Sequence, residues 1–387
     1  MIDRRSFLKS GSLALAGSAI TIKSFASNSS IRNAGIALEW RNRQSDMAYR
    51  QLGKTGLMIS EIVNGGDPVS TKNYRMVETA MEKGLNYLDM APAYGRGECE
   101  KGYSLIIDSS SKREKVFMTT KVSGFPNVRN RLYREIFDGL PDGKKERIRK
   151  RAADLREQRG VDIPGYYLTY WPGQERSMDP SYLSNAMEED YAHKVEGSAA
   201  FKKYIINSVH GSLQRTKQEY FDILMCPHGG NCPEEVQIPE IYETLEKLKK
   251  EGLVRFLGVS THNDPAGVLR AATATGKYDV VMCAYNVING GYMHEAIRDA
   301  KNAGLGIIGM KVAMAVATHH KKLQPLPQWR IDKVNQIVPG DMKPPMKAYL
   351  WALQNPNISA VISNLWDEKY VEENLSLVGQ KVELRPG

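Results

Sequence analysis

Four side chains suited to acid–base chemistry follow three apolar segments of this chain. The segment L-N-Y-L-D-M-A-P-A-Y-G carries Asp89 where its apolar part ends, and Tyr94 follows shortly after. The segment V-F-M-T-T-K ends in Lys121, and Y-F-D-I-L-M-C-P-H ends in His228. If these segments are parallel strands, their carboxyl ends lie on one face of the sheet, where active sites form. The pattern therefore predicts one site that holds a carboxylate, a phenol, an ammonium and an imidazole.

This set of groups suits the interconversion of a carbonyl and a hydroxyl group. A free tyrosine, with a pKa of about 10, is a reluctant proton donor and a worse base. A nearby ammonium favours the phenolate, so we expect Lys121 to lower the pKa of Tyr94. Asp89 would keep the lysine charged and oriented. The combination predicts proton transfer by Tyr94 at the oxygen of a substrate.

The elements that must position these groups can be read from the alternation of apolar and amphipathic segments. From Ile59 onward, short apolar segments alternate with helical ones, which is typical of βα units around a parallel sheet. Helices are expected over 238–251 and 294–303, among others. Eight strands are predicted, namely I-S-E-I-V-N, L-N-Y-L-D, V-F-M-T-T-K, F-D-I-L-M-C, V-R-F-L-G-V-S, Y-D-V-V-M-C-A-Y, G-L-G-I-I-G-M-K and I-S-A-V-I-S.

Eight βα units make an α/β fold of the (β/α)8 TIM barrel type the leading prediction. A doubly wound sheet would need a G-x-G-x-x-G turn after its first strand, and N-G-G-D-P does not provide one. Residues 47–387 are assigned to the barrel, with a long helical insertion over 125–200 after the third strand. The predicted architecture thus places all four chemical groups on the carboxyl face of one barrel.

These strand-end residues resemble those of the aldo/keto reductase family. The segment Y-R-Q-L-G-K-T-G-L, residues 49–57, is similar to the N-terminal hairpin that closes the bottom of the barrel in that family. The resemblance implies an NAD(P)-dependent oxidoreductase with Tyr94 as general acid/base and His228 as a neutral imidazole that orients the substrate carbonyl. Pro227 occupies the family's usual histidine position and His228 comes one residue later, so we expect a bulge or a shifted loop.

The resemblance also implies a set of cofactor-binding residues. Ser260 in G-V-S-T-H-N takes the position of a serine that binds the nicotinamide carboxamide, whereas the usual asparagine is displaced to Asn263. Met310 stands where an aromatic side chain commonly stacks on the nicotinamide. The full predicted set is Ser260, Asn263, Met310, Lys311, Asn364, Glu373 and Asn374.

The residues expected around the adenine end favour NAD slightly over NADP. The serine and basic residues that bind a 2′-phosphate in the family are replaced by Asn364, Leu365 and Tyr370, and Lys369 is the only cation nearby in the sequence. These substitutions leave an alternative open. If the methionines only pack the core, the barrel binds no cofactor and serves as a periplasmic binding or processing protein.

Residues 1–26 look like a twin-arginine export signal. D-R-R-S-F-L-K is followed by an apolar run rich in glycine and alanine and by S-F-A, with a cleavage site after Ala26. A polar spacer over 27–46 separates this signal from the barrel. The pattern predicts transport to the periplasm by the twin-arginine machinery, with no stable membrane anchor after processing.

Export has a consequence for the cofactor, because nicotinamide nucleotides are made and recycled in the cytoplasm. The twin-arginine route carries folded proteins, so the cofactor can be loaded before transport. We therefore expect tightly bound NAD or NADP that alternates between two substrates, or that is oxidised and reduced on one molecule as in an epimerase or a lyase.

The second half of the insertion is aromatic, with G-Y-Y-L-T-Y-W-P-G over 165–173. Its tyrosines and Trp171 follow the strand that carries Lys121, and aromatic platforms stack on sugar rings. A small sugar-like substrate, or a lid over the site, is one interpretation. Simple packing of these aromatic residues against the barrel is the other.

Composition limits the remaining function classes. With 387 residues, 42% of them hydrophobic and 25% charged, the chain can bury a full core. Its net charge of +9 is not accompanied by a groove-binding or base-stacking motif, so a nucleic-acid partner is not predicted. The segment C-P-H-G-G-N-C offers three ligands with unusual spacing, which favours buried free thiols or a disulfide over a metal site.

Overall fold

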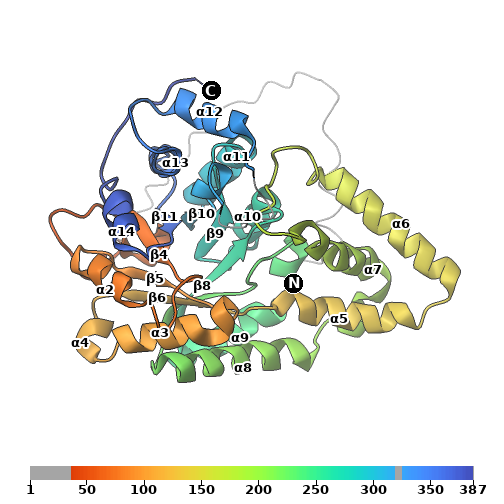
Figure 1. Cartoon of the computed structure of the whole chain (residues 1–387). Helices are drawn as coiled ribbons and strands as arrows, with labels where there is room; N and C mark the ends of the chain where they lie inside the picture. The colour runs from red at the N-terminus through yellow and green to blue at the C-terminus, as the bar shows by residue number, and fades with distance from the viewer. Residues whose placement is uncertain (1–35, 319–324, 387) are drawn as a thin grey trace, which may run out of the picture. The chain divides into compact units, whose positions relative to one another are not determined.

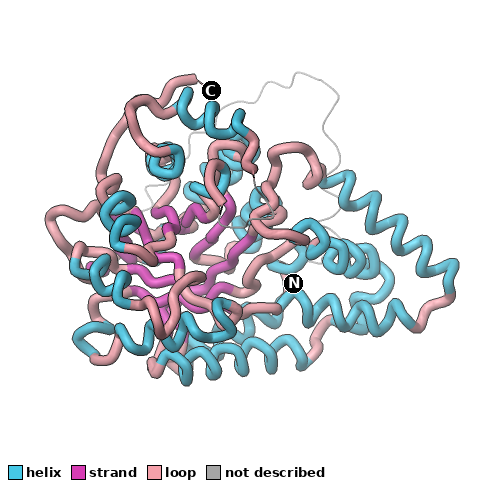
Figure 2. Tube along the Cα trace, in the orientation of Figure 1, coloured by secondary structure: helices cyan, strands magenta, loops and turns pink. Residues whose placement is uncertain are grey.

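A computed structural model describes residues 36–318 and 325–386 of the chain. At its centre is a closed barrel with the strand order β10-β11-β4-β5-β6-β7-β8-β9, and every neighbouring pair is parallel. Helices surround the strands (Figures 1 and 2). The barrel strands are β4 (Ile62–Gly65), β5 (Tyr87–Asp89), β6 (Phe117–Lys121), β7 (Phe221–Met225), β8 (Val254–Thr261), β9 (Val280–Ala284), β10 (Gly306–Met310) and β11 (Ala360–Ser363). The predicted (β/α)8 TIM barrel is confirmed.

Alternation along the strands explains their nearly continuous apolar sequences. Tyr87 and Ile223 belong to a core inside the barrel, whereas the next residues, Leu88 and Leu224, belong to the core between the strands and the helices. Successive strand side chains point to opposite faces, and both faces of this sheet are covered. Apolar residues are therefore required at almost every strand position.

The helices outside the insertion follow the barrel strands and pack against them. In the helix expected over 238–251, for example, Ile241, Leu245 and Leu248 are buried at helical spacing. These helices are α2 (Arg75–Glu82), α3 (Glu98–Ile106), α4 (Ser110–Arg113), α8 (Ala199–Thr216), α9 (Pro239–Lys250), α10 (Pro265–Thr275), α11 (Gly290–Asn302), α12 (Gln328–Ile337), α13 (Pro344–Leu353) and α14 (Glu368–Leu375). Short 3-10 turns lie at η1 (Gly53–Thr55), η2 (Tyr94–Gly97), η4 (Pro233–Val236) and η5 (Ala313–Ala315).

The N-terminal hairpin is present and gains a third strand. Strands β2 (Tyr49–Gln51) and β3 (Leu57–Ser60) pair in antiparallel fashion, and β1 (Glu39–Trp40) lies parallel to β3. The expected first barrel strand, I-S-E-I-V-N, is divided between two elements. Ser60 ends β3, and β4 begins only at Ile62. This part of the prediction was wrong because the apolar sequence continues through the bend between the strands.

The insertion after β6 consists of α5 (Phe125–Asp138), α6 (Asp142–Arg159), η3 (Gln174–Ser177) and α7 (Asp179–Val195). Figure 1 shows α5, α6 and α7 extending to one side of the barrel. Helix α5 buries an apolar face that includes Phe125 and Tyr133, whereas Ile148 is the one residue of α6 that is buried. The basic, solvated segment expected in the first half of the insertion corresponds to α6.

The described helices include none that is both long enough and apolar enough to cross a membrane.

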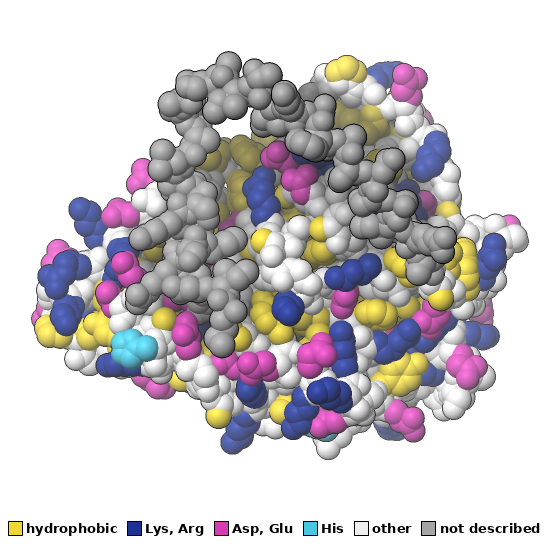
Figure 3. Space-filling model, turned by 180° about the vertical axis from the view of Figure 1, so that it is seen from behind, with side chains coloured by type: hydrophobic (Ala, Val, Ile, Leu, Met, Phe, Trp, Pro, Cys, Tyr) yellow, Lys and Arg dark blue, Asp and Glu magenta, His cyan; other side chains and the backbone are white. Residues whose placement is uncertain are grey.

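On the face of the molecule in Figure 3, basic and acidic side chains are intermixed. The predicted export signal over 1–26 lies outside the described residues, as does the spacer up to residue 35.

Candidate active site

Asp89 and Lys121 form an ion pair at the carboxyl ends of two neighbouring strands. Asp89 is the last residue of β5 and lies opposite Thr119, and Lys121, two residues further, is the last residue of β6, so both side chains lie at the same end of the sheet and on the same face. Lys121 Nζ donates a hydrogen bond to Asp89 Oδ1 and another, of 3.3 Å, to the carbonyl oxygen of Met90. Only 1% of the Lys121 side chain and 2% of the Asp89 side chain are exposed. A buried charge requires a partner, so the pair fixes the ammonium in place.

Tyr94 completes a hydrogen-bonded triad with this pair. It begins the short turn η2 that follows β5, where Gly95 and Arg96 adopt left-handed backbone angles. Lys121 Nζ lies 3.1 Å from Tyr94 Oη, and Tyr94 Oη donates to Asp89 Oδ2 over 3.4 Å. The structure therefore brings together the phenol, the ammonium and the carboxylate that the sequence singled out.

The electrostatic effect on Tyr94 differs from the expected one. Burial, followed by the Asp89 carboxylate, raises the pKa of the Tyr94 phenol well above its ordinary value. The expected lowering of this pKa was wrong, because burial and the Asp89 carboxylate outweigh the effect of the nearby ammonium. A raised pKa keeps the phenol protonated at neutral pH, which suits a proton donor.

His228 faces the same phenol from the loop after β7. The rings of Tyr94 and His228 have centroids 5.7 Å apart and an interplanar angle of 86°. Burial, together with the charges of Lys121 and Lys311, lowers the pKa of His228 well below its ordinary value. The one-residue shift in the sequence therefore leaves a neutral imidazole beside Tyr94.

Ser123 holds this imidazole and was not identified from the sequence. Its Oγ lies 2.8 Å from His228 Nδ1 and accepts a hydrogen bond of 3.3 Å from the backbone N–H of Ala93. A hydroxyl has one proton and two acceptor lone pairs, so it can accept from Ala93 and donate to Nδ1 at the same time. We assign the imidazole proton to Nε2 on this basis. Its position in the loop directly after Lys121 could have identified Ser123 from the sequence.

Three of the predicted cofactor residues lie at the same face. Ser260 belongs to β8, and its Oγ accepts a hydrogen bond of 3.1 Å from the backbone N–H of Gly229. Met310 ends β10 and packs in the core inside the barrel. Lys311 is the next residue, and its backbone φ of 59° lies in the left-handed region. Its ammonium lies over the rings of Tyr170 and Trp171 of the insertion.

The Asn263 side chain is not available to bind a cofactor in this arrangement, because its polar groups are already hydrogen-bonded. Its Nδ2 donates to Ser177 Oγ over 2.8 Å and to Asn231 Oδ1 over 2.7 Å, while its Oδ1 accepts from Gln174 Nε2 over 2.7 Å. The side chain is buried and joins the insertion to the loops after β7 and β8. The structure thus uses this asparagine as an anchor for the insertion.

The residues expected around the adenine end lie at β11 and α14. Asn374 Nδ2 donates to Ser363 Oγ over 2.8 Å, and Asn364 follows the strand. Glu373 accepts a hydrogen bond from Lys343, which is 30 positions away in the sequence. The expectation that Lys369 would be the only cation nearby was wrong, because a remote loop brings a second one.

The donor set at this face fits a nicotinamide dinucleotide. Ser260 retains a hydroxyl proton that can be donated to a carboxamide oxygen. The Asn364 side chain makes no hydrogen bond to any other described residue, so its amide is free for a ligand. A Cβ at Gly65 would lie 2.6 Å from Asn364 Oδ1, so glycine is needed for this close approach. Ser260 and Asn364 are therefore side chains at this face that are available to hold a cofactor.

No cluster of three or more metal-binding side chains occurs in the ranges 36–318 and 325–386. The four cysteines, which are Cys99, Cys226, Cys232 and Cys283, are buried free thiols. Of the two possibilities left open for the cysteines near His228, the structure thus shows free thiols.

Several known proteins resemble this chain in sequence. The oxidoreductase YqkF of Bacillus subtilis is 28% identical over 219 residues, which is 56% of this chain and 49% of the relative. An aldo-keto reductase of Fusarium vanettenii is 25% identical, with 67% of this chain and 62% of the relative covered. L-galactose dehydrogenase of Arabidopsis thaliana is 26% identical, with 47% and 60% covered. The chain thus spans about half to three-fifths of the length of these relatives.

Solved structures resemble the fold. The holo form of an aldo-keto reductase from Bacillus halodurans matches with a TM-score of 0.57 at 19% identity, covering 87% of this chain and 92% of that one. An aldo-keto reductase from Klebsiella pneumoniae in complex with NADPH matches with a TM-score of 0.55 at 14% identity, covering 87% and 91%. A model of the aldo/keto reductase family matches residues 56–384, which include the whole barrel and its catalytic face. The chain therefore belongs to the aldo/keto reductase family.

Proposed function

We propose that this protein is an NAD(P)-dependent oxidoreductase that interconverts a carbonyl and a hydroxyl group of a small polyol, sugar or ketone. The observation that carries the proposal is the hydrogen-bonded group of Asp89, Lys121 and Tyr94, with the neutral imidazole of His228 beside it. Two kinds of relative support it. The neighbour from Klebsiella pneumoniae was solved with NADPH, and one sequence relative is named for a sugar, L-galactose.

We propose a separate role for each residue. Tyr94 Oη donates its proton to the substrate oxygen as negative charge develops there. The ammonium of Lys121, 3.1 Å away, stabilises the phenolate that this transfer leaves behind. His228 donates from Nε2 to the same substrate oxygen and so orients the carbonyl. When bound, the nicotinamide supplies or accepts the hydride at the substrate carbon.

The location of the enzyme and the use of its cofactor extend this proposal. The twin-arginine pattern over 1–26 supports export to the periplasm as a folded protein. We propose that NAD(P) is loaded before export, is retained and is turned over by two substrates, or within one substrate as in an epimerase or a lyase. Replacement of Arg4 and Arg5 by lysine is expected to leave the protein in the cytoplasm, as cell fractionation would show.

The preference between the two nucleotides depends on the adenine end. Substitution of the family's 2′-phosphate residues supports NAD. Lys343, held by Glu373, offers one cation for a 2′-phosphate, but the carboxylate already neutralises that cation. We therefore propose that NAD is favoured slightly and that NADP is also accepted.

The direct test replaces Tyr94 by phenylalanine. Loss of the proton donor is expected to lower kcat/KM by about 10²- to 10⁴-fold. The matched control is Tyr220→Phe, because Tyr220 lies at the opposite end of the barrel, over Arg113. The nucleotide content of the native protein is measured after denaturation, by absorbance and mass. An empty protein that also fails to bind added NAD(P) would support the cofactor-free alternative.

A further inference from the structure

A second group of side chains lies beside the catalytic residues and is not used in the proposed proton transfer. His262 follows β8, Lys311 follows β10, and Tyr170 and Trp171 come from the insertion. The rings of Trp171 and His262 are 5.0 Å apart and perpendicular. Lys311 Nζ lies 5.7 Å from the centroid of Trp171 and 5.8 Å from that of Tyr170. Three distant parts of the sequence thus meet at one edge of the site.

The Lys311 ammonium forms no ion pair or hydrogen bond with a described residue, although the more distant carboxylates of Asp67 and Asp89 favour its charge, and one nitrogen of His262 also lacks a partner. Lys311 forms no ion pair with any residue in the described part of the chain, and burial lowers the pKa of its ammonium. His262 Nδ1 is buried without a hydrogen-bond partner. Lys311 is half-buried, so its ammonium is only partly solvated, and a buried nitrogen without a hydrogen bond is unfavourable. Such groups are commonly completed by a ligand.

The cluster adjoins the catalytic group. The charge of Lys311 contributes to the lowered pKa of His228 and of His262, and the ring of Trp171 contacts both Lys311 and His262. The Tyr170 side chain is held in position, because its hydroxyl accepts a hydrogen bond of 2.9 Å from Asn286 Nδ2. A molecule whose reacting carbon faces Tyr94 would therefore extend towards a fixed aromatic wall and a cation.

We infer that Lys311 binds a carboxylate of the substrate, which is a hydroxylated acid of the uronate class. Trp171 would lie against the apolar face of the carbon skeleton, and His262 would bond to one of its hydroxyl groups. This inference rests on the proposed function, whose substrate it narrows from polyols, sugars and ketones in general to acidic sugars.

A neighbouring cleft is consistent with an anionic ligand. It has a volume of about 740 Å³ and is lined by Tyr167, Trp329, Arg330 and Lys333, among others. The Nε atom of Arg330 is buried without a hydrogen-bond partner, and neither Arg330 nor Lys333 has an ion-pair partner among the described residues. The positive electrostatic field of these two side chains attracts an acidic substrate to the site.

A phosphate of the cofactor is the other source of negative charge that Lys311 could bind. The position of the ammonium between aromatic rings of the insertion favours the substrate. Aromatic faces suit a carbon skeleton, whereas a pyrophosphate is bound by polar groups and backbone N–H groups. The two sources differ in a measurable way, because only a substrate carboxylate makes Lys311 discriminate between substrates.

The test compares D-galacturonate with D-galactose, which differ only in the carboxylate at one end. In the native protein we expect kcat/KM for reduction of the uronate to exceed that of the neutral sugar by about 10- to 100-fold, as for a hydrogen bond to a charged group. Lys311→Met should bring this ratio close to one, and Lys311→Arg should retain most of it. The control Lys277→Met, which changes an exposed lysine after α10, should keep the native ratio.

Equal kcat/KM values for the two sugars in the native protein would overturn the inference, whether or not the variants fold. A weaker Kd for NAD(P) in Lys311→Met with an unchanged substrate ratio would also overturn it, since that result assigns the lysine to the cofactor. Binding of D-galacturonate, followed by tryptophan fluorescence, separates the two proposals. If no substrate is turned over but binding is lost in Lys311→Met, the acid site stands and the proposed function fails.

Discussion

The two ends of the barrel differ in how their charged groups are paired. At the amino end of the strands, Asp222 is fully buried and is surrounded by three guanidinium groups. Arg113 lies 2.8 Å from its carboxylate, Arg255 2.7 Å and Arg41 3.3 Å. At the carboxyl end, Lys311 forms no ion pair with any described residue, and His262 Nδ1 is buried without a hydrogen-bond partner. The charges around Asp222 are neutralised within the chain, whereas Lys311 is a cation that a ligand can neutralise.

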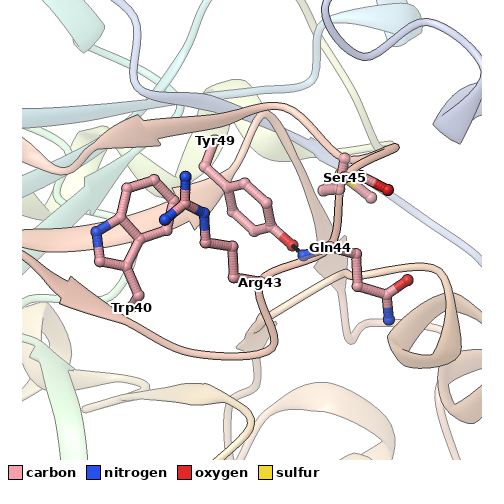
Figure 4. Close-up of a pocket in the computed structure, with 6 residues that line it drawn as sticks. Trp40, Arg43, Gln44, Ser45 and Tyr49 are labelled. Carbon is pink, nitrogen blue, oxygen red and sulfur yellow. Dashed lines mark hydrogen bonds between the residues drawn. The ribbon is translucent and has the colours of Figure 1, made fainter.

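A pocket at the amino end supports the same distinction. Figure 4 shows Arg43 lying over the ring of Trp40, at 4.2 Å from its centroid. The hydroxyl of Tyr49 donates to the carbonyl of Asn42 over 2.7 Å and accepts from the N–H of Gln44 over 3.1 Å. The guanidinium and the phenol that line this hollow are already engaged. A concave surface alone therefore does not distinguish the functional end.

The strongest test of this contrast removes the charge of Asp222. Asp222→Asn would leave three guanidinium groups without their shared carboxylate, and loss of one partner of a buried pair costs about 3–5 kcal/mol. We expect the free energy of unfolding in urea to fall by that amount, while kcat/KM of the folded protein stays close to native. Asp341→Asn changes an exposed carboxylate and should be neutral. A loss of activity without a loss of stability would contradict the division between the two ends.

A smaller effect is expected from the hydroxyl that positions His228. Ser123→Ala removes the partner of Nδ1, so both tautomers of the imidazole become available. We expect kcat to fall about tenfold, as for one hydrogen bond. We also expect the pH profile of kcat/KM to change, which a purely structural role would not produce. Ser123→Thr keeps a hydroxyl and should restore both. Unchanged kinetics in Ser123→Ala would remove Ser123 from the active site.

The smallest effect concerns stability below neutral pH. Burial lowers the pKa of His262 well below its ordinary value, so the folded state keeps this imidazole neutral while the unfolded state takes up a proton. The stabilisation is complete above about pH 6.5 and is lost as the pH falls towards the folded pKa, by about 1.4 kcal/mol per pH unit. Urea unfolding of His262→Gln should show a shallower slope between pH 7.5 and 5.5. The control His193→Gln, on an exposed position, should keep the native slope.

Much of the fold could be predicted because apolar segments and their polar ends are local signals. Asp89 and Lys121 were placed together correctly because parallel strands bring their carboxyl ends to one face whatever the side chains around them. The same reasoning assigned Tyr94 and His228, which follow such ends directly. The division of the first predicted strand was missed because an apolar sequence does not reveal a bend within it.

The remaining features depend on contacts between distant parts of the chain. The pairing of Lys343 with Glu373 and of Asp222 with its arginines cannot be read from spacing, because each joins loops or strands far apart in the sequence. The direction of the pKa shift at Tyr94 was misjudged because it depends on whether the ammonium or the carboxylate has the larger effect. That balance is set by burial and by distances of a few ångströms.

The hydrogen bonds of Asn263 have one more consequence. One of its N–H groups and its oxygen bond to Ser177 and Gln174 of the insertion, while the other N–H bonds to Asn231, so detachment of the insertion would leave buried polar groups unpaired. The insertion and the barrel therefore belong to one cooperative unit, and the amide hydrogens of η3 are expected to exchange with solvent only when the whole unit unfolds. The aromatic wall over the site is thus already in place before any substrate arrives.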